Sequence, residues 1–266
     1  MPDTLTLPIL SEIVPRGFGY GKNYLVEFDP HSLWYEASLT IATHSLKRGI
    51  KTDYHTFTHI PDEIREAFAN LGLNVKKLED DNTLRIVDSY SLTTLLKRSK
   101  EAEKSGIVQS MERSLNLNDW TKDNFDFVKE EIPEIEKNRL HIDDDTSVLV
   151  SYNDEKTFID HWRTSAIPWA RIFGWAMLHS SVTGAYSENF YRQFESICDG
   201  IIDFRSREEN GMIEHYIRWR ATRGKPLDSR WRRLRLSNNG EVTLTAESRP
   251  AAELGIGRWL RGPRKQ

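Results

Sequence analysis

The sequence is poor in cysteine and has no long apolar run. Its 266 residues contain one cysteine, Cys198, which excludes an intrachain disulfide and fits a protein of the reducing cytoplasm. No stretch approaches the ~18 consecutive apolar residues that a membrane-spanning helix needs. Residues 1–4 do not begin a basic region followed by an apolar core, so we expect no secretory signal. A hydrophobic content of 38% and a mean hydropathy of −0.60 indicate a water-soluble globular protein.

A further absence lies at the first junction between a strand and a helix. Residues 24–27 predict a buried strand, and residues 37–47 predict a helix. In nucleotide-binding α/β folds such a junction carries G-x-x-x-x-G-K-[ST], whose backbone N–H groups and lysine hold phosphates. Here the junction contains no glycine and no lysine, and it reads Phe28-Asp29-Pro30-His31-Ser32-Leu33-Trp34-Tyr35-Glu36. We therefore expect a loop packed shut by aromatic side chains.

Strand and helix patterns alternate along the rest of the chain. We predict strands over 52–57, 84–87, 140–143 and 172–178, and helices over 61–71, 158–173 and 187–197. Closing strands follow over 201–205, 213–219, 231–236 and 241–245, the last two joined by a hairpin signal at Asn238-Asn239-Gly240. This order predicts an α/β fold with a mostly parallel central sheet flanked by helices, followed by antiparallel C-terminal strands. We expect one domain over 1–246, with a helical insertion at about 91–138, and a basic tail over 247–266.

The order of segments resembles the RecA superfamily, specifically the KaiC-like branch that also holds the RadA paralogs. The resemblance covers about residues 9–245 and rests on short matches in the family's order: Val14–Gly17, Leu25–Glu27, Ser45–Gly49, Pro61–Arg65, Leu71–Leu73, Lys77–Glu79, Leu84–Asp88 and Phe194–Asp203. It implies a three-layer RecA-like fold. It also implies self-association, because family members form rings and filaments.

Compared with an ATPase of that family, three of four site elements are lost or reduced. In the ungapped comparison Trp34 takes the place of the P-loop lysine and Phe28 that of its first glycine. Thr58-His59 replaces the two acids that follow the second strand. The basic K-x-R-G element of a neighbouring subunit is reduced to Ala221-Thr222-Arg223-Gly224. The Mg²⁺-holding acid at a strand end has a counterpart in Asp143, with Asp144 beside it.

Several polar residues fall at or just after predicted strand ends. In open α/β sheets the ligand crevice lies at the carboxyl ends of the strands, so His31, His59, Asp143 and His179 could converge there. Imidazoles with a carboxylate suit a transition metal, but no pair has the spacing of a ligand motif. We therefore predict no metal. A small ligand in this crevice and a crevice without ligand both stay open.

The C-terminal part of the chain is basic. From residue 205 onward it carries 15 Lys+Arg and 7 Asp+Glu, a net charge of +8. Because the net charge of the whole chain is −3, residues 1–204 carry a net charge of −11. Arginines alternate with tryptophans there, a composition typical of single-stranded nucleic-acid grooves. The opposing interpretation places the tryptophans in the core and the arginines on a solvated edge. The candidate contacts, to nucleic acid or to a neighbouring subunit, are Arg218, Arg220, Arg223, Arg232 and Arg233.

The sequence therefore predicts a cytoplasmic RecA-like protein without catalytic activity. We expect a regulatory or assembly role through contacts with a protein partner or with copies of itself, no membrane partner and no cofactor. Weak residual binding of ATP and Mg²⁺ stays open. The alternatives are a single-stranded nucleic-acid-binding mediator similar to the RadA paralogs, a small-ligand sensory domain and a residual ATPase.

Overall fold

The computed structural model describes residues 4–14, 18–91, 117, 137–209, 211–224 and 228–249. Six strands run parallel in one sheet: β3 (Lys22–Phe28), β4 (Thr52–Thr56), β5 (Leu84–Asp88), β6 (Leu140–Asp143), β7 (Ala176–Val182) and β8 (Gly200–Glu209). Three antiparallel strands extend it: β9 (Met212–Thr222), β10 (Trp231–Leu236) and β11 (Val242–Arg249). The strand order is β11-β10-β9-β8-β3-β7-β6-β4-β5. The predicted mostly parallel sheet with an antiparallel C-terminal extension is confirmed.

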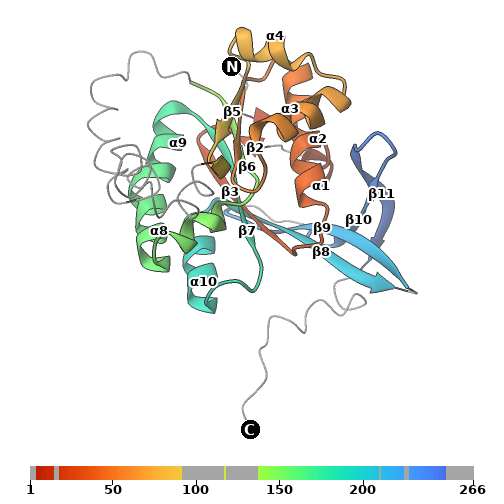
Figure 1. The fold of residues 1–266 in the computed structure, drawn as a ribbon. Coiled ribbons are helices and arrows are strands. Elements are labelled where there is room, and N and C mark those ends of the chain that lie inside the picture. The colour runs from red at the N-terminus through yellow and green to blue at the C-terminus, as the bar shows by residue number, and fades with distance from the viewer. Residues whose placement is uncertain are drawn as a thin grey trace, which may run out of the picture.

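Helices cover both faces of this sheet (Figure 1). One face packs against α1 (Leu10–Ile13), α2 (Trp34–Lys47), α3 (Pro61–Asn70) and α4 (Val75–Asp80). The other packs against α8 (Glu155–His161), α9 (Ile167–Phe173) and α10 (Glu188–Ile197), together with the 3₁₀ turn η3 (Thr146–Ser151) and the π turn η4 (Trp162–Ala166). A separate small sheet pairs β1 (Thr4–Leu5) with β2 (Phe18–Gly19). The arrangement has three layers, as expected.

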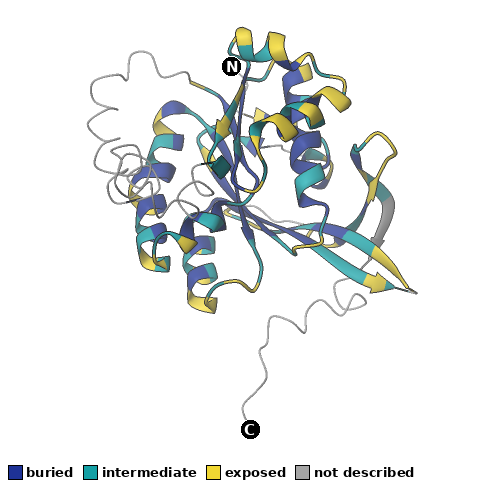
Figure 2. Ribbon diagram, viewed as in Figure 1, coloured by how far each residue is buried: buried dark blue, intermediate teal, exposed yellow. Residues whose placement is uncertain are grey.

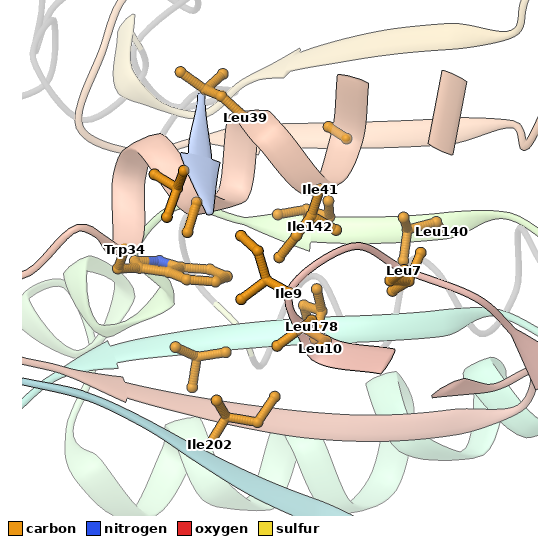
Figure 3. Close-up of a cluster of buried hydrophobic side chains, with 14 of the residues drawn as sticks. Leu7, Ile9, Leu10, Trp34, Leu39, Ile41, Leu140, Ile142, Leu178 and Ile202 are labelled. Atoms are coloured by element: carbon orange, nitrogen blue, oxygen red, sulfur yellow. The ribbon is translucent and has the colours of Figure 1, made fainter. Parts of the chain in front are cut away.

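The two faces of the parallel sheet differ in chemistry. The face toward α2 is apolar, and Figure 3 shows Ile142, Leu178 and Ile202 within a single cluster with residues of α1 and α2. Successive strand residues point to opposite faces, and the alternate positions carry polar groups. The central strands are mostly buried (Figure 2). The buried polar residues at these positions are Asn23, Glu27, Asp53, His141, Asp143, His179 and Asp203. We call this side the polar face. Because buried polar groups are costly unless paired, its side chains need partners within the protein.

Several predicted boundaries are corrected by the structure. Helix α2 begins at Trp34, three residues earlier than predicted, and β11 runs to Arg249, into the expected tail. The helix predicted over 158–173 begins at Glu155 and is interrupted by the π turn η4, before Pro168. The strand predicted over 172–178 begins only at Ala176, because α9 ends at Phe173 with Gly174 at φ +67°. Most of the predicted insertion at 91–138 lies outside the described residues.

Candidate functional site

The loop between β3 and α2 is short and tied to its neighbours. It spans residues 29–33, and the backbone N–H of Ser32 donates to the carbonyl of Asp29 at 2.9 Å. The Asp29 carboxylate accepts hydrogen bonds from Thr183 Oγ1 at 2.8 Å and from the Ser206 N–H at 3.2 Å. Thr183 directly follows β7, and Ser206 lies within β8. The acid at the start of the loop therefore connects β3 to the segments on both of its sides, just after β7 and within β8.

Trp34 is the first residue of α2, and its indole is part of the core. Its exposed fraction is 1%, and Nε1 donates to the carbonyl of Asp144 at 2.9 Å. The ring meets that of Phe204 edge-on, with 5.3 Å between centroids. Figure 3 shows the indole pointing from the helix start into the apolar cluster. Phe28, which is partly buried, packs against the same cluster.

Tyr35 and His59 cover the next part of this region. Their rings stack with centroids 4.0 Å apart and an interplanar angle of 14°. His59 Nδ1 also lies 3.5 Å from a carboxylate oxygen of Asp144. His59 is therefore held between an aromatic ring and a buried carboxylate.

The Asp144 carboxylate is fully occupied by the loop that follows β4. It accepts hydrogen bonds from the backbone N–H groups of Phe57 at 2.7 Å and Thr58 at 3.2 Å. The Thr58 hydroxyl donates to it at 2.7 Å, whereas the Thr56 hydroxyl donates to the His59 carbonyl at 2.6 Å and lies 3.3 Å from the acid. Three protein donors thus converge on one acid. Such an acid fixes the position of the loop and has little free capacity for a metal ion.

Asp143 lies on the polar face and is bound by histidines. His179 Nδ1 hydrogen-bonds its carboxylate at 2.8 Å, and His55 Nδ1 lies 3.7 Å from its other oxygen. His179 Nε2 in turn hydrogen-bonds Asn23 Oδ1 at 3.1 Å. Burial by itself raises the pKa of Asp143, but the hydrogen bond from His179 and the neighbouring imidazoles outweigh it and lower the pKa below its ordinary value. The carboxylate form is therefore held by the protein itself.

A second buried group surrounds Asp53 on the same face. Arg139 Nε donates to Asp53 at 2.7 Å, and His141 Nε2 lies 3.3 Å from the other Asp53 oxygen. The rings of His141 and Trp175 are 4.5 Å apart. Burial lowers the pKa of His141 to about 4, although the charge of Asp53 opposes that effect. His141 is consequently a neutral imidazole near pH 7.

The four predicted crevice residues do not form one site. Asp143 and His179 are in contact and buried, whereas His59 lies at the loop after β4 and His31 is exposed. Within the ranges that the structure describes, no group of three or more His, Cys, Asp or Glu side chains is arranged to hold a metal ion. Of the four residues predicted to converge at the strand ends, only Asp143 and His179 are in contact.

Two of the predicted arginines, Arg218 and Arg220, are held by acids. Arg218 Nε lies 2.6 Å from Asp203, and its guanidinium sits 4.5 Å above the ring of Trp231. Arg220 contacts Glu27 and Glu195, each at 2.9 Å. Trp219 and Trp231 are buried, as the interpretation with tryptophans inward predicts, but Arg218 and Arg220 are half-buried beside acids and do not form the solvated edge that it also predicts. A nucleic-acid phosphate would have to compete with these carboxylates.

The remaining three arginines are also engaged. Arg223 donates to the carbonyl of Ser196 at the amino-terminal edge of the parallel strands, away from the β3–α2 loop. Arg232 pairs with Asp228 at 3.0 Å, and Arg233 pairs with Glu214. None of them points to a shared site with Asp143.

Sequence reasoning missed Glu27, although it lies in the most central strand. Glu27 is 4% exposed, and its carboxylate shares the Arg220 guanidinium with Glu195 and Asp203. Burial raises the pKa of Glu27 to about 8, and Arg220 only partly offsets this effect. The sequence did contain a signal: Glu27 follows Asn23 by four residues in the same strand, and an even spacing places both side chains on the same face of the sheet.

The comparisons with known proteins bear on the fold. No model of a known protein family matches the sequence, and no curated protein matches it. A solved structure, a KaiC-like protein from the hyperthermophilic archaeon Pyrococcus horikoshii, is similar with a TM-score of 0.60 and 13% identity. The similarity covers 91% of this chain and 97% of that chain. At this identity it shows a shared fold and not a shared activity. None of the helices in the described ranges is both long and apolar enough to cross a bilayer.

Proposed function

We propose that this chain is a RecA-like protein of the KaiC-like type that has no ATPase activity and acts by binding other proteins. The fold is the one that a KaiC-like protein also has. The function is inferred from the loop between β3 and α2, where that fold type would bind phosphates. We expect a regulatory or assembly role in which the protein contacts a partner or another copy of itself.

The burial of Trp34 carries this proposal. A phosphate loop needs open backbone N–H groups and a lysine that reaches the phosphates. At the position of that lysine this chain has an indole whose NH is already bonded to the Asp144 carbonyl. An α2 start that is anchored in the core by an aromatic ring supports a closed loop.

The acids of the region support the same proposal. A Mg²⁺ ion needs carboxylate oxygens that are free to bind it together with the nucleotide phosphates. Asp144 accepts three hydrogen bonds from the protein, and Asp143 is bound by His179. Both carboxylates therefore serve the architecture of the strand ends.

Titration with Mg·ATP and measurement of phosphate release test the proposal. We expect no saturable binding at millimolar nucleotide and no phosphate release above the background of a heat-inactivated sample. The variants Asp143→Ala and His31→Ala guard against a contaminating ATPase, because Asp143 is the candidate Mg²⁺-holding acid whereas His31 is exposed in the β3–α2 loop. Phosphate release that Asp143→Ala abolishes and His31→Ala preserves would contradict the proposal and support a residual ATPase.

Two alternatives have direct tests. For the nucleic-acid mediator, the positive charge beyond residue 205 favours binding, whereas the ion pairs of Arg218 and Arg220 oppose it. Affinity for single-stranded DNA that falls steeply with salt would support it, and no binding at low salt would remove it.

For the small-ligand sensor, a thermal-shift screen with nucleotides, metals and metabolites is decisive, because a ligand that binds only the folded state raises stability.

A further inference from the structure

Arg220 lies between two carboxylates that come from different layers of the fold. Its Nη2 atom is 2.9 Å from Glu27 Oε2 on β3 and 2.9 Å from Glu195 Oε1 on α10. One guanidinium group therefore joins this helix to the polar face of the sheet. The Glu27 side chain is 5% exposed, whereas that of Glu195 is 28% exposed. The contact is thus buried on the side of the sheet and open to water on the side of the helix.

The other arginines nearby serve different partners. Arg218 Nε lies 2.6 Å from Asp203 and balances the charge of that acid. Arg205 donates to the backbone carbonyl of Glu27 at 2.7 Å and lies 3.7 Å from its carboxylate. The single positive charge of Arg220 is consequently left to balance two carboxylates, one from the sheet and one from α10.

A proton resolves this imbalance of charge. Oε1 of Glu27 is buried and receives no hydrogen bond from any donor in the described ranges. Burial raises the pKa of Glu27 most, and the charge of Asp203 and the charge and hydrogen bond of Glu195 add to it, so that it reaches about 8 in spite of the guanidinium group. Because ionised carboxylates only accept, a hydrogen bond between two of them requires a proton on one. Near neutral pH the folded protein therefore holds one proton between Glu27 and Glu195.

The remaining groups around Glu27 leave this charge unchanged. Burial raises the pKa of Tyr191 on α10 and of Cys198 directly after it, so both are neutral near pH 7. On β7 the residue in register with Glu27 is Ser181, which is buried and uncharged. The Asp29 carboxylate, just after β3, accepts two hydrogen bonds from other segments.

The same turn of α10 also carries an apolar anchor. Phe190 and Phe194 are 1% and 0% exposed, and their rings lie 5.4 and 5.2 Å from that of Phe158 between centroids. Glu195 follows Phe194 directly in the helix. The burial of this ring and the position of the Glu195 carboxylate therefore depend on one helical turn. Displacement of that turn exposes an aromatic surface.

We propose that the contact between Glu27 and Glu195 is a proton-controlled latch that holds the carboxyl-terminal turn of α10 on the sheet. While the proton is present, the two carboxyl groups bond to each other and to Arg220. When it leaves, two negative charges face one guanidinium group in a buried position, and the turn separates from β3 so that water reaches them. The open helix presents Phe194 to solvent. This regulation goes beyond the proposed protein-binding function and does not depend on it.

The pH dependence of opening follows from the change in proton affinity. In the closed state the pKa of Glu27 is about 8, and in the open state it returns to its ordinary 4.5. The open state holds the proton less tightly, so opening becomes more favourable as the pH rises from 4.5 to about 8 and levels off above that. From pH 6 to pH 8 the ratio of open to closed α10 should rise about fiftyfold.

Native-state hydrogen exchange tests the latch. The amides of α10 in the wild-type protein are followed by mass spectrometry between pH 6 and pH 8, with each rate corrected for the intrinsic exchange of a free peptide at that pH. We expect the corrected exchange of the last turn of α10 to accelerate about fiftyfold over this range. The amides of α3, which lies on the other face of the sheet, report wider unfolding and should not show this rise.

Three substitutions complete the experiment. Glu27→Gln keeps the contacts without the titration, because its amide donates to Glu195 and its carbonyl accepts from Arg220, so exchange of α10 should lose its pH dependence. Glu195→Gln removes the second charge and should leave a smaller rise than in the wild-type protein. Glu188→Gln is the matched control, because it makes the same change on the same helix at a side chain that is 73% exposed. It should retain the full rise.

The outcomes are distinct from those of the nucleotide and partner experiments. Corrected exchange of α10 that is independent of pH in the wild-type protein would overturn the latch, and this measurement needs no variant. An equal rise in Glu27→Gln would overturn it as well. So would an equal rise in the amides of α3, because the opening would then not be confined to α10. None of these results measures nucleotide hydrolysis or the binding of a partner.

Discussion

His141 should make the stability of the protein depend on pH. Its imidazole is buried on the polar face, with Asp53, His55, Asp143 and Arg139 as charged or titratable neighbours. Burial lowers the pKa of His141 to about 4, below the ordinary 6.5 of an exposed histidine. Between these two values the unfolded chain binds the proton more readily than the folded protein. The free energy of unfolding must therefore fall as the pH falls from 6.5 toward 4.

The size of the effect follows from the two pKa values. At 1.36 kcal/mol per pKa unit, the whole difference is worth about 3 kcal/mol. About 2 kcal/mol of this is lost between pH 7 and pH 5 by the same relation. A typical domain has a free energy of unfolding of about 5–15 kcal/mol, so the loss is easily measured.

Urea unfolding of the wild-type protein and His141→Gln at pH 7 and pH 5 is the assay. Other groups also titrate in this window: His161, whose pKa burial lowers to about 4, and Glu27, whose raised pKa of about 8 makes stability fall as the pH rises above 4.5. These contributions are present in both proteins and cancel in the comparison. Between pH 7 and pH 5 we expect the wild-type protein to lose about 2 kcal/mol more unfolding free energy than the His141→Gln variant. Identical pH dependence in the two proteins would refute the reasoning.

Three further outcomes are expected. Trp34→Ala should lower the free energy of unfolding, measured in urea, by about 3–5 kcal/mol. The exposed control His31→Ala should change it by less than about 0.5 kcal/mol. Equal effects of the two substitutions would contradict the core position of the indole. Arg139→Met should cost about 3–5 kcal/mol because Asp53 stays buried without its cation, and adding Asp53→Asn should recover part of the loss. Cys198 should react with a thiol reagent only after unfolding, because burial raises the pKa of its thiol; labelling of the native protein at the rate of a free thiol would show otherwise.

Much of the fold follows from local patterns in the sequence. The strands over 140–143 and 231–236 were predicted at their observed ends, because short β-rich runs there are bounded by turn residues. The hairpin at residues 238–240 joins β10 to β11, as its Asn-Gly pair predicts. The strand predicted from Ile172 failed because a short apolar run does not distinguish a helix end from a strand.

The site was less accessible to sequence reasoning. The missing glycines and lysine of the β3–α2 loop are visible in the sequence itself. Which donors bind Asp144, and that His179 and not His59 binds Asp143, depend on atoms brought together across strands. The arginine–tryptophan pattern was open to two interpretations, and the acids that pair with Arg218 and Arg220 come from β3, β8 and α10.

The sequence by itself determined the alternation of strands and helices and the absence of glycine and lysine from residues 28–36, since both reside in the identity and spacing of neighbouring residues. Only the tertiary structure decided that one face of the sheet is apolar and the other polar in its interior. The physical reason is that burial and pairing depend on which strands lie side by side, and strand order is set by contacts between segments far apart in the chain.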